Sequence, residues 1–345
     1  MLTDIFAERY KLTPLWTKFT ETERRLLVQT YRLFSEQACP FSEDNKTLWF
    51  DLQSRLSMEL GQASLSPLTY NFMGTWNGQP HHYHGSWEMN HVCETWFLSD
   101  FGGNVSADRF VKERVSFIEL AFRLVEERIA TNNANLPAAI KQAEDFFGTR
   151  ATRSGKPRFP GNYADSIRVK NEKTNKDFHQ AVMELNARLR QAECNLHYHN
   201  GFVQRAGDDR MQAEIDTPFW ELVSASKWKN VDTDIKEAID LRDTDGRDPA
   251  FYAARSLEST IKIISSEKQL TTGREKGAHH YIDNLMSAKL IEVWEMEALK
   301  HFFTKVRNPF GHGPGSAPMP RLTDHQTNWA IENSMIWIKS LIRRV

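Results

Sequence analysis

The sequence predicts a mainly α-helical protein, because apolar residues recur at helical spacing and follow residues that commonly cap helices. Thr20 and Glu23 form a capping-box pattern ahead of one such segment. The apolar residues that follow it are Leu27, Tyr31, Phe34 and Ala38. A longer stripe has a period near 3.6 and consists of Val111, Val115, Ile118, Phe122, Val125 and Ile129. We therefore expect two amphipathic helices before residue 130.

The connections between helical segments predict the domain boundaries. Residues 66–104 carry Pro67, Pro80 and five glycines among aromatic residues, which predicts a long, structured, irregular segment. The polar stretch Thr131–Leu136 indicates a boundary near residue 130, and residues 148–166 have the composition of an exposed loop. A charged helical segment then leads through a turn at Asn200-Gly201 into the last unit. We expect an N-terminal helical domain (1–130), a basic loop and helical connector (131–215), and a C-terminal helical bundle (216–345).

The C-terminal bundle begins with a well-defined helix. Asp248 is a suitable N-cap, and Pro249 follows at the first helical position. The residues expected to be buried are Ala254, Leu257, Ile261 and Ile264.

Two more helices are predicted after it. The first should end near Val306, because Pro309 removes an amide donor and favours extended geometry at Asn308. Its expected buried residues are Ile291, Trp294, Ala298 and Phe302. The last helix opens with a capping box, Thr323 and Gln326. Its expected buried residues are Ile331, Met335, Ile338 and Ile342.

The composition predicts a cytoplasmic protein. Lysine plus arginine (44) nearly equals aspartate plus glutamate (45), so a surface for nucleic acid would have to be local. Asp4 and Glu8 interrupt the N-terminal apolar residues, and no run of eighteen apolar residues occurs, so we expect neither a secretory signal nor a membrane span. The three cysteines are far apart, which favours a reducing compartment over a disulfide framework.

One segment of the last unit suits phosphodiester chemistry. Arg307, Asn308 and His312 stand around Pro309 and two glycines. Arginine can bind a phosphate with a planar fork of donors, and histidine can transfer protons near neutral pH. Together they suit cleavage of RNA by its own 2′-hydroxyl, in which His312 moves the proton, Arg307 stabilises the pentacoordinate phosphate and Asn308 orients it. The product would be a 2′,3′-cyclic phosphate, and DNA should survive.

Spacing alone does not select this site. Arg274 and His279 have the same separation, so the pattern occurs twice in the last unit. The expected end of the helix, the adjacent Asn308 and the glycines favour Arg307 and His312. Gly311-His312-Gly313-Pro314-Gly315 superficially suggests a phosphate-binding loop, but the lysine and hydroxyl residue of a P-loop do not follow.

Three runs of residues resemble known families. Arg307-Asn308-Pro309-Phe310-Gly311-His312 is similar to the Arg-polar-x-x-x-His signature of the HEPN superfamily of ribonucleases and toxins. The segment from Asp248 to Lys262 resembles the preceding helix of the abortive-infection C-terminal branch of that superfamily. Residues 1–130, with Arg55–Gly61 and Trp76–Pro80, resemble an N-terminal domain of AbiJ-like abortive-infection proteins.

The resemblance implies an antiphage effector that is a metal-independent endoribonuclease and needs no cofactor. It implies a homodimer, in which two Arg-x-x-x-x-His motifs form one composite cleft, and an N-terminal domain that responds to a phage or host trigger. Arg307, Asn308 and His312 would be the catalytic residues, and Glu258 would support the arginine. Some superfamily toxins have a tyrosine two residues after the histidine that an antitoxin modifies; Pro314 stands there in this chain, so that control does not carry over.

Alternative interpretations stay open for each group. Arg307 and His312 could serve a helix C-terminus, and Glu258 could pair with Arg255 or Lys262 at helical spacing. The C-terminal domain could then be a non-catalytic dimerisation, RNA-binding or protein-binding module.

The remaining polar clusters favour structural roles. Four histidines beside Glu88 and Glu94, and the pair His197 and His199, could hold a transition metal, but we predict no metal site at either. A basic loop could bind RNA phosphates or be a solvated linker. The four histidines are His81, His82, His84 and His91, and the basic residues are Arg150, Arg153, Lys156 and Arg158.

Overall fold

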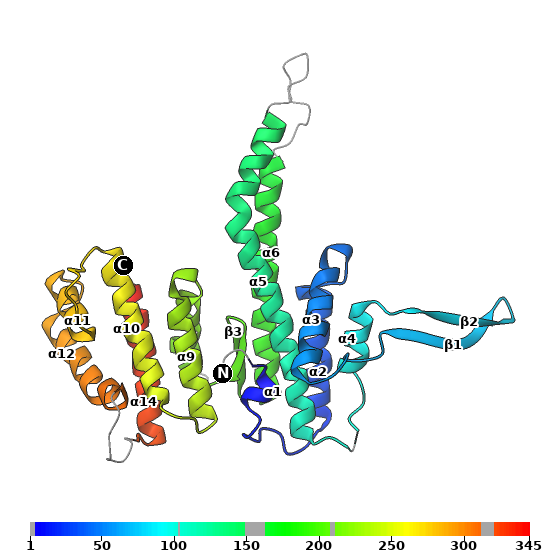
Figure 1. Ribbon diagram of the computed structural model, residues 1–345, viewed down its shortest axis with the longest axis horizontal. Coiled ribbons are helices and arrows are strands. Elements are labelled where there is room, and N and C mark those ends of the chain that lie inside the picture. The colour runs from blue at the N-terminus through cyan, green and yellow to red at the C-terminus, as the bar shows by residue number, and fades with distance from the viewer. Residues whose placement is uncertain (1–3, 103, 149–162, 208–210, 312–320) are drawn as a thin grey trace. The chain divides into compact units, whose positions relative to one another are not determined.

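The computed structural model describes residues 4–102, 104–148, 163–207, 211–311 and 321–345 (Figure 1). Helices dominate these residues, and they include two sheets of two strands each, so the prediction of a mainly α protein is confirmed. The chain divides into two compact units. The N-terminal unit consists of residues 5–7 and 15–203, and the C-terminal unit of residues 8–14 and 204–345 together with Asp4. Of the exposed loop predicted at residues 148–166, residues 149–162 with its basic side chains lie outside the described residues, whereas Gly148 ends α5 and residues 163–166 begin α6 instead of belonging to a loop.

The first half of the chain forms long helices and two short hairpins. In chain order the elements are α1 (Phe6–Arg9), α2 (Glu21–Arg32), the π-helical turn η1 (Leu33–Ala38), the 3-10 turn η2 (Glu43–Asn45), α3 (Lys46–Glu59), β1 (Thr69–Trp76), β2 (Gln79–Ser86), α4 (Met89–Phe97), α5 (Ala107–Gly148), α6 (Tyr163–Gln191), β3 (Leu196–His199) and β4 (Phe202–Arg205).

The predicted start of α2 is confirmed, because the Thr20 hydroxyl accepts from the Thr22 amide and the Glu23 carboxylate accepts from the Thr20 amide at 2.7 Å.

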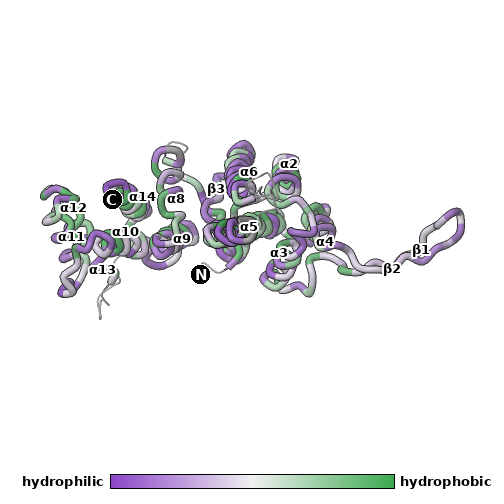
Figure 2. The backbone as a smooth tube through the Cα atoms, turned by 90° about the horizontal axis from the view of Figure 1, so that it is seen from above, coloured by the Kyte–Doolittle hydropathy of each residue, from purple (hydrophilic) through white to green (hydrophobic). Residues whose placement is uncertain are grey.

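The helix α5 does not stop at the predicted boundary. Its apolar stripe from Val111 to Ile129 is buried as expected, and the helix continues through Thr131–Leu136 to Gly148, packed against α6. The polar residues here form side-chain contacts between the two helices, such as Asn133 Nδ2 to Asn175 Oδ1 at 2.9 Å. Figure 2 shows hydrophilic and hydrophobic residues alternating around both helices. Polarity in this stretch therefore marks a solvated helix pair, which the sequence pattern alone does not distinguish from a linker.

The segment predicted to be irregular forms a hairpin and a helix. β1 and β2 pair antiparallel, with Trp76 opposite Gln79 and Thr69 opposite Ser86. Asn77 and Gly78 join them with φ of 48° and 79°, the left-handed conformations that a two-residue hairpin turn requires. The second Asn-Gly pair does the same between β3 and β4, with φ of 42° at Asn200 and 83° at Gly201, so the predicted turn there is confirmed.

The C-terminal unit is a helical bundle around one apolar core. Its elements are the π-helical turn η3 (Gln212–Asp216), α8 (Thr217–Val223), the 3-10 turn η4 (Ser226–Trp228), α9 (Lys229–Asp243), α10 (Pro249–Glu267), α11 (Ala278–Ser287), α12 (Val293–Phe302), the π-helical turn η5 (Phe303–Arg307), α13 (Asn308–Gly311) and α14 (Asp324–Ile342). The central helix is α10, which packs against α9, α11, α14 and η5.

Two of the predicted C-terminal helices are confirmed. All four predicted apolar residues of α10 are buried, and Asp248 stands at its N-cap position. Asp248 has φ 59° and its carboxylate accepts from Arg247 Nε at 3.0 Å, so the helix starts there without a side-chain cap. In α14 the Thr323 and Gln326 capping box is present. Its buried face is nearly as predicted, with Leu341 buried and Ile342 half-buried.

The predicted buried residues around α12 are only half confirmed. Ile291 and Phe302 are buried as predicted, but Trp294 is 65 % exposed and Ala298 is exposed, and Glu295 and Leu299 are buried in their place. Ile291 is buried but precedes the helix, which begins only after Glu292 has capped it. Counting the stripe from Ile291 therefore assigned the wrong face, and Glu295 is buried because Arg344 pairs with its carboxylate.

Candidate functional site

The chain around Arg307 is helical where the sequence predicted an end. α12 continues through η5 into α13, and Asn308 has φ −65° and ψ −39° in place of the predicted extended geometry. The Asn308 amide donates to the Phe303 carbonyl, five residues back, as in a π-helix. Pro309 is then the second residue of a new helical segment, where an amide donor is not needed. The wide turn thus lets the helix accept a proline that a regular helix would reject.

One face of α10 carries the side chains that lie near Arg307. Phe251, Arg255, Glu258 and Lys262 are four, three and four residues apart, which places them along one stripe beside the buried stripe. Glu258 is only 8 % exposed, although it is charged. A buried carboxylate is normally paired with a cation.

Two cations do lie close to Glu258. Arg307 Nη2 is 3.2 Å from its Oε2, and Lys262 Nζ is 2.8 Å from its Oε1. Arg255 pairs with Asp234 of α9, with contacts of 2.6 and 3.0 Å, and this contact raises the pKa of the Arg255 guanidinium. Glu258 therefore joins α10 to η5, and of the two helical pairings considered from the sequence it forms the one with Lys262.

An aromatic ring and a glycine shape the space around the Arg307 guanidinium. Its central carbon lies 5.7 Å from the centroid of the Phe251 ring. A Cβ atom at Gly311 would come within 3.0 Å of Nη1, so the glycine leaves room for the guanidinium. Within the described residues, the buried Nε of Arg307 has no hydrogen-bond partner. The side chain is 27 % exposed and keeps donors that Glu258 does not use.

This arrangement suits binding of an anion. Arg307 and Lys262 carry two positive charges against the single negative charge of Glu258, and a guanidinium can bind phosphate oxygens with two parallel donors. Asn308 lies next in the chain and is half-buried. His312 lies outside the described residues, so its side chain is not placed relative to Arg307.

The other predicted clusters have local partners. His82 Nε2 contacts Asn71 Oδ1 across the hairpin, and the His91 ring lies 4.2 Å from the Trp87 ring. His197 lies 3.3 Å from Asn186 Nδ2, and burial lowers the pKa of its imidazole to about 4. Among the residues that the structure describes, no group of three or more His, Cys, Asp or Glu side chains is arranged to hold a metal ion.

The competing arginine and histidine pair sits elsewhere in the bundle. Arg274 is exposed in the loop before α11, and His279 Nε2 lies 3.4 Å from Thr304 Oγ1. The pair thus offers a matched comparison for Arg307 and His312, with the same spacing in the same unit.

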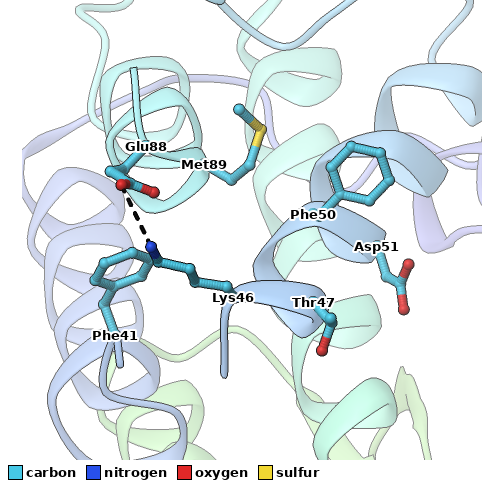
Figure 3. Close-up of a pocket in the computed structure, with 7 residues that line it drawn as sticks. All are labelled: Phe41, Lys46, Thr47, Phe50, Asp51, Glu88 and Met89. Atoms are coloured by element: carbon cyan, nitrogen blue, oxygen red, sulfur yellow. Dashed lines mark ion pairs between the residues drawn. The ribbon is translucent and has the colours of Figure 1, made fainter. Parts of the chain in front are cut away.

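The N-terminal unit has a separate open cleft with a volume of about 330 Å³ (Figure 3). Lys46 and Glu88 face each other across it, 3.6 Å apart. Its lining is largely apolar, so it suits a small apolar group more than a phosphate. The residues around it are Phe41, Lys46, Thr47, Phe50, Asp51, Glu88 and Met89.

Sequence reasoning missed two parts of the Arg307 environment. Phe251 and Gly311 belong to the quoted runs, but no role was assigned to either. The signal for Phe251 was present in its spacing of seven residues before Glu258, which puts both on one face of α10. Gly311 lies four residues after Arg307, the spacing of neighbours on one helical face, but the predicted helix end near Val306 hid this signal.

Fold and site together define the class of protein. It is a helical protein in two units, and in its C-terminal bundle the arginine of an Arg-x-x-x-x-His segment is paired with a buried carboxylate. A family model described as AbiJ N-terminal domain 4 matches residues 4–221, more than half of the chain, and the protein belongs to this family. The protein is thus AbiJ-like, which places it in the context of abortive-infection defence. Comparisons with curated proteins and with solved structures gave no match.

The matched range is longer than the predicted N-terminal domain. It includes all of residues 131–215, which the sequence analysis assigned to a connector. The match also ends before α9, so the helices that carry Glu258 and Arg307 lie outside it. No described helix is both long and apolar enough to cross a membrane.

Proposed function

We propose that the protein is an RNA-cutting effector of antiphage defence that uses Arg307, Asn308 and His312 without a metal. Glu258 positions Arg307 in this scheme. The N-terminal domain responds to a phage or host trigger, and the protein acts in the cytoplasm as a homodimer.

The environment of Arg307 is the observation that supports this proposal. A carboxylate at 3.2 Å and the Phe251 ring lie on two sides of the guanidinium, and the Arg307 side chain is still 27 % exposed. An arginine held in this way loses little conformational entropy when it binds a phosphate. Its position five residues before His312 keeps the two groups in one short segment.

The proposed reaction is an intramolecular transfer at phosphorus. The 2′-oxygen of a ribose attacks the adjacent phosphorus, and its proton passes to a base. The 5′-oxygen of the next nucleotide leaves and takes up a proton, which yields a 2′,3′-cyclic phosphate and a 5′-hydroxyl. His312 supplies one of the two proton transfers, and the Arg307 guanidinium stabilises the charge that develops on the phosphoryl oxygens. The nucleophile belongs to the substrate, so no activated water is required.

The dimer matters because one histidine performs only one of the two proton transfers at a time. In a homodimer with a twofold axis, the same patch of both subunits meets, and two motifs share one cleft. A second His312 could then perform the other transfer. This arrangement rests on the resemblance of residues 248–312 to the HEPN superfamily.

A degradation assay with purified full-length protein tests the proposal. Labelled RNA and DNA of the same sequence are incubated with the protein in EDTA, and the RNA products are tested for a cyclic phosphate end. We expect RNA to be cut and DNA to stay intact. His312→Ala and Arg307→Ala should abolish cutting, whereas the matched variants His279→Ala and Arg274→Ala should retain it.

Expression in a bacterium provides a second readout that does not depend on a purified activator. The wild-type chain should arrest growth and the His312→Ala chain should not. RNA that stays intact in vitro, combined with equal growth of both strains, would refute the nuclease.

A binding or regulatory module is the rival function. The Arg307 to Glu258 pair also links η5 to α10, as a purely structural contact would. If this function is correct, the wild-type protein will bind RNA or a protein partner and leave the RNA uncut. Arg307→Ala will then weaken that binding.

A further inference from the structure

We infer that the β1–β2 hairpin is a self-association element, in which β1 of one copy pairs antiparallel with β1 of a second copy. The hairpin projects from the helices of the N-terminal unit (Figure 1). This inference goes beyond the proposed function and does not depend on Arg307.

The hairpin lies in a segment without charge. Residues 60–87 contain no Asp, Glu, Lys or Arg, although 26 % of the chain is charged. Exposed hairpins are normally kept apart by charged side chains on their strands. Without lysine or arginine, a surface of this kind fits a neutral partner better than a nucleic acid.

Large apolar side chains of the hairpin remain exposed. Phe72 is 50 % exposed, Met73 is 66 % exposed and Trp76 is 63 % exposed. Phe72 stacks on Tyr83 of β2 with ring centroids 5.3 Å apart. Two strands alone give marginal stability in water, and a further strand would extend this aromatic face and cover part of it.

The free edge of β1 is suited to pairing. In the described part of the chain, β1 has β2 as its one strand neighbour. The Trp87 amide donates to the Leu68 carbonyl at 2.9 Å, and hydrogen-bonded pairs alternate along an antiparallel ladder. Even-numbered residues of β1 therefore bond to β2. The amides and carbonyls of the odd-numbered residues, Thr69, Asn71, Met73 and Thr75, point to the free edge. β1 contains no proline, whereas β2 contains Pro80.

The residue order of β1 favours a second copy over an unrelated strand. When two β1 strands run antiparallel around Met73, Met73 faces its own counterpart and Asn71 faces Thr75 of the other copy. On the opposite face, Tyr70 lies across from Trp76 and Phe72 lies across from Gly74. The same relation already exists within the hairpin, where the Tyr70 ring lies over Gly85 directly across from it. The Tyr83 ring lies over Gly74 from the diagonal position, so Phe72 of the second copy would pack against that ring.

A charge swap at the twofold position tests the pairing. The mass of the full-length protein is measured by sedimentation for wild type, Met73→Lys, Met73→Glu and an equimolar mixture of both variants. We expect each single variant to have half the mass of the wild-type assembly, because like charges meet at Met73. The mixture should recover the wild-type mass. If the C-terminal domain also dimerises, each single variant should fall back to the mass of that dimer, and RNA cutting should be unaffected.

Cysteine cross-linking tests the register independently. Met73→Cys should form an interchain disulfide, since residues in a hydrogen-bonded antiparallel pair lie about 5.5 Å apart at Cα, within disulfide range. Thr75→Cys alone should not, but Thr75→Cys mixed with Asn71→Cys should. The native chain is the control; burial raises the pKa of the Cys39 and Cys194 thiols to about 11, which keeps them slow to react.

Two results would overturn the inference. One is an unchanged mass in both Met73 variants together with no cross-link at position 73. The other is a wild-type protein whose mass equals that of the Met73 variants but which sediments with phosphatidylglycerol vesicles or binds an extended peptide. Phe72→Ser would abolish that binding. The hairpin would then serve a lipid surface or a foreign strand.

Discussion

The described part of the C-terminal unit contains two arginine–glutamate pairs, and they differ in how many hydrogen bonds the arginine makes within the protein. Arg344 binds Glu295 through both oxygens, at 2.6 and 3.0 Å, and also donates to the Leu290 carbonyl and the Ser340 hydroxyl. Arg307 contacts Glu258 at one point, 3.2 Å away, and its Nε is unpaired within the described residues. Both glutamates are buried, at 7 and 10 % side-chain exposure.

The Arg344–Glu295 pair is a contact that stabilises the fold, whereas the Arg307–Glu258 pair leaves the arginine able to bind an anion. A guanidinium has five N–H donors, and the Arg344 pair directs them to protein acceptors. Among the described residues, the one acceptor near the Arg307 guanidinium is Glu258, so most of its N–H donors make no hydrogen bond within the described part of the protein. Gly311 leaves space beside the guanidinium. The four predictions that follow test this contrast, beginning with the largest effect.

Removing Arg307 or His312 should lower activity strongly, and Arg307→Ala should also lower stability, because it leaves the buried Glu258 carboxylate with Lys262 alone. We expect Arg307→Ala and His312→Ala each to lower the rate of RNA cutting by about 10²–10⁴-fold, the usual size of a lost charge-stabilising or proton-transfer group. Initial cutting rates measure this, and urea unfolding monitors the fold. Arg344→Ala is the control, because it should retain activity. Equal rates for Arg307→Ala and Arg344→Ala would erase the distinction between the two pairs.

Neutralising each glutamate should give opposite results. Glu258→Gln should lower cutting by about tenfold, because the guanidinium loses its orienting charge. Glu295→Gln should leave cutting unchanged and lower the free energy of unfolding by about 1–2 kcal/mol, since Arg344 is partly exposed and loses charge-assisted hydrogen bonds. Parallel activity and urea-unfolding measurements compare the two variants. If Glu258→Gln proves the more destabilising of the two, its pair is structural.

A Cβ atom at position 311 should disturb Arg307 without affecting the core. Gly311→Ala places that atom 3.0 Å from Nη1, so the guanidinium must shift, and we expect a loss of about three- to tenfold in cutting. Gly277→Ala is the matched control, because a Cβ atom there meets nothing within 4 Å. Thermal unfolding should show similar midpoints for both variants. Full activity in Gly311→Ala would mean that the exact place of the guanidinium is unimportant.

The Arg344 pair should also contribute a pH-dependent term to stability. Hydrogen bonds from Arg344 hold the pKa of the Glu295 carboxyl below its usual value. A depressed pKa in the folded state stabilises the protein above the unfolded pKa of about 4.3, and this contribution disappears as the pH falls through the folded value. The stability difference between wild type and Glu295→Gln should therefore be constant from pH 7 to pH 5 and shrink below about pH 4. Urea unfolding at each pH gives the difference, and one that grows on acidification would contradict the assignment.

The sequence predicted those elements that local rules determine. The stripe of α10 and the capping boxes of α2 and α14 depend on residues close in the chain, and all three are confirmed. The buried face of α12 was not predictable in the same way, since Glu295 is buried only because Arg344, far along the chain, neutralises it. The first hairpin was missed although Asn77-Gly78 is a strong turn signal, because histidines and glycines obscure the alternation of its strands.

The sequence predicted which residues form the candidate site, but not how they are arranged. Resemblance to a family pointed to Arg307 and to Glu258 as its support, and the two side chains are in contact. The rule that proline ends a helix failed at Pro309, because it assumes regular α-helical hydrogen bonding and the chain here forms a π-helical turn. Gly311 meets the Arg307 side chain because the chain stays helical past Pro309.

The π-helical turn η5 has a consequence for how this region tolerates changes in length. A turn closed five residues back holds one residue more than a regular turn, so it behaves like a single-residue insertion that the helix has absorbed. Deleting one residue within it, such as Thr304, would remove the wide turn and leave an ordinary helix whose parts before and after it keep their relative orientation. The same deletion inside the regular helix α10 would rotate everything beyond it by about 100°. Loss of one codon should therefore be tolerated better in η5 than in the helix that carries Glu258.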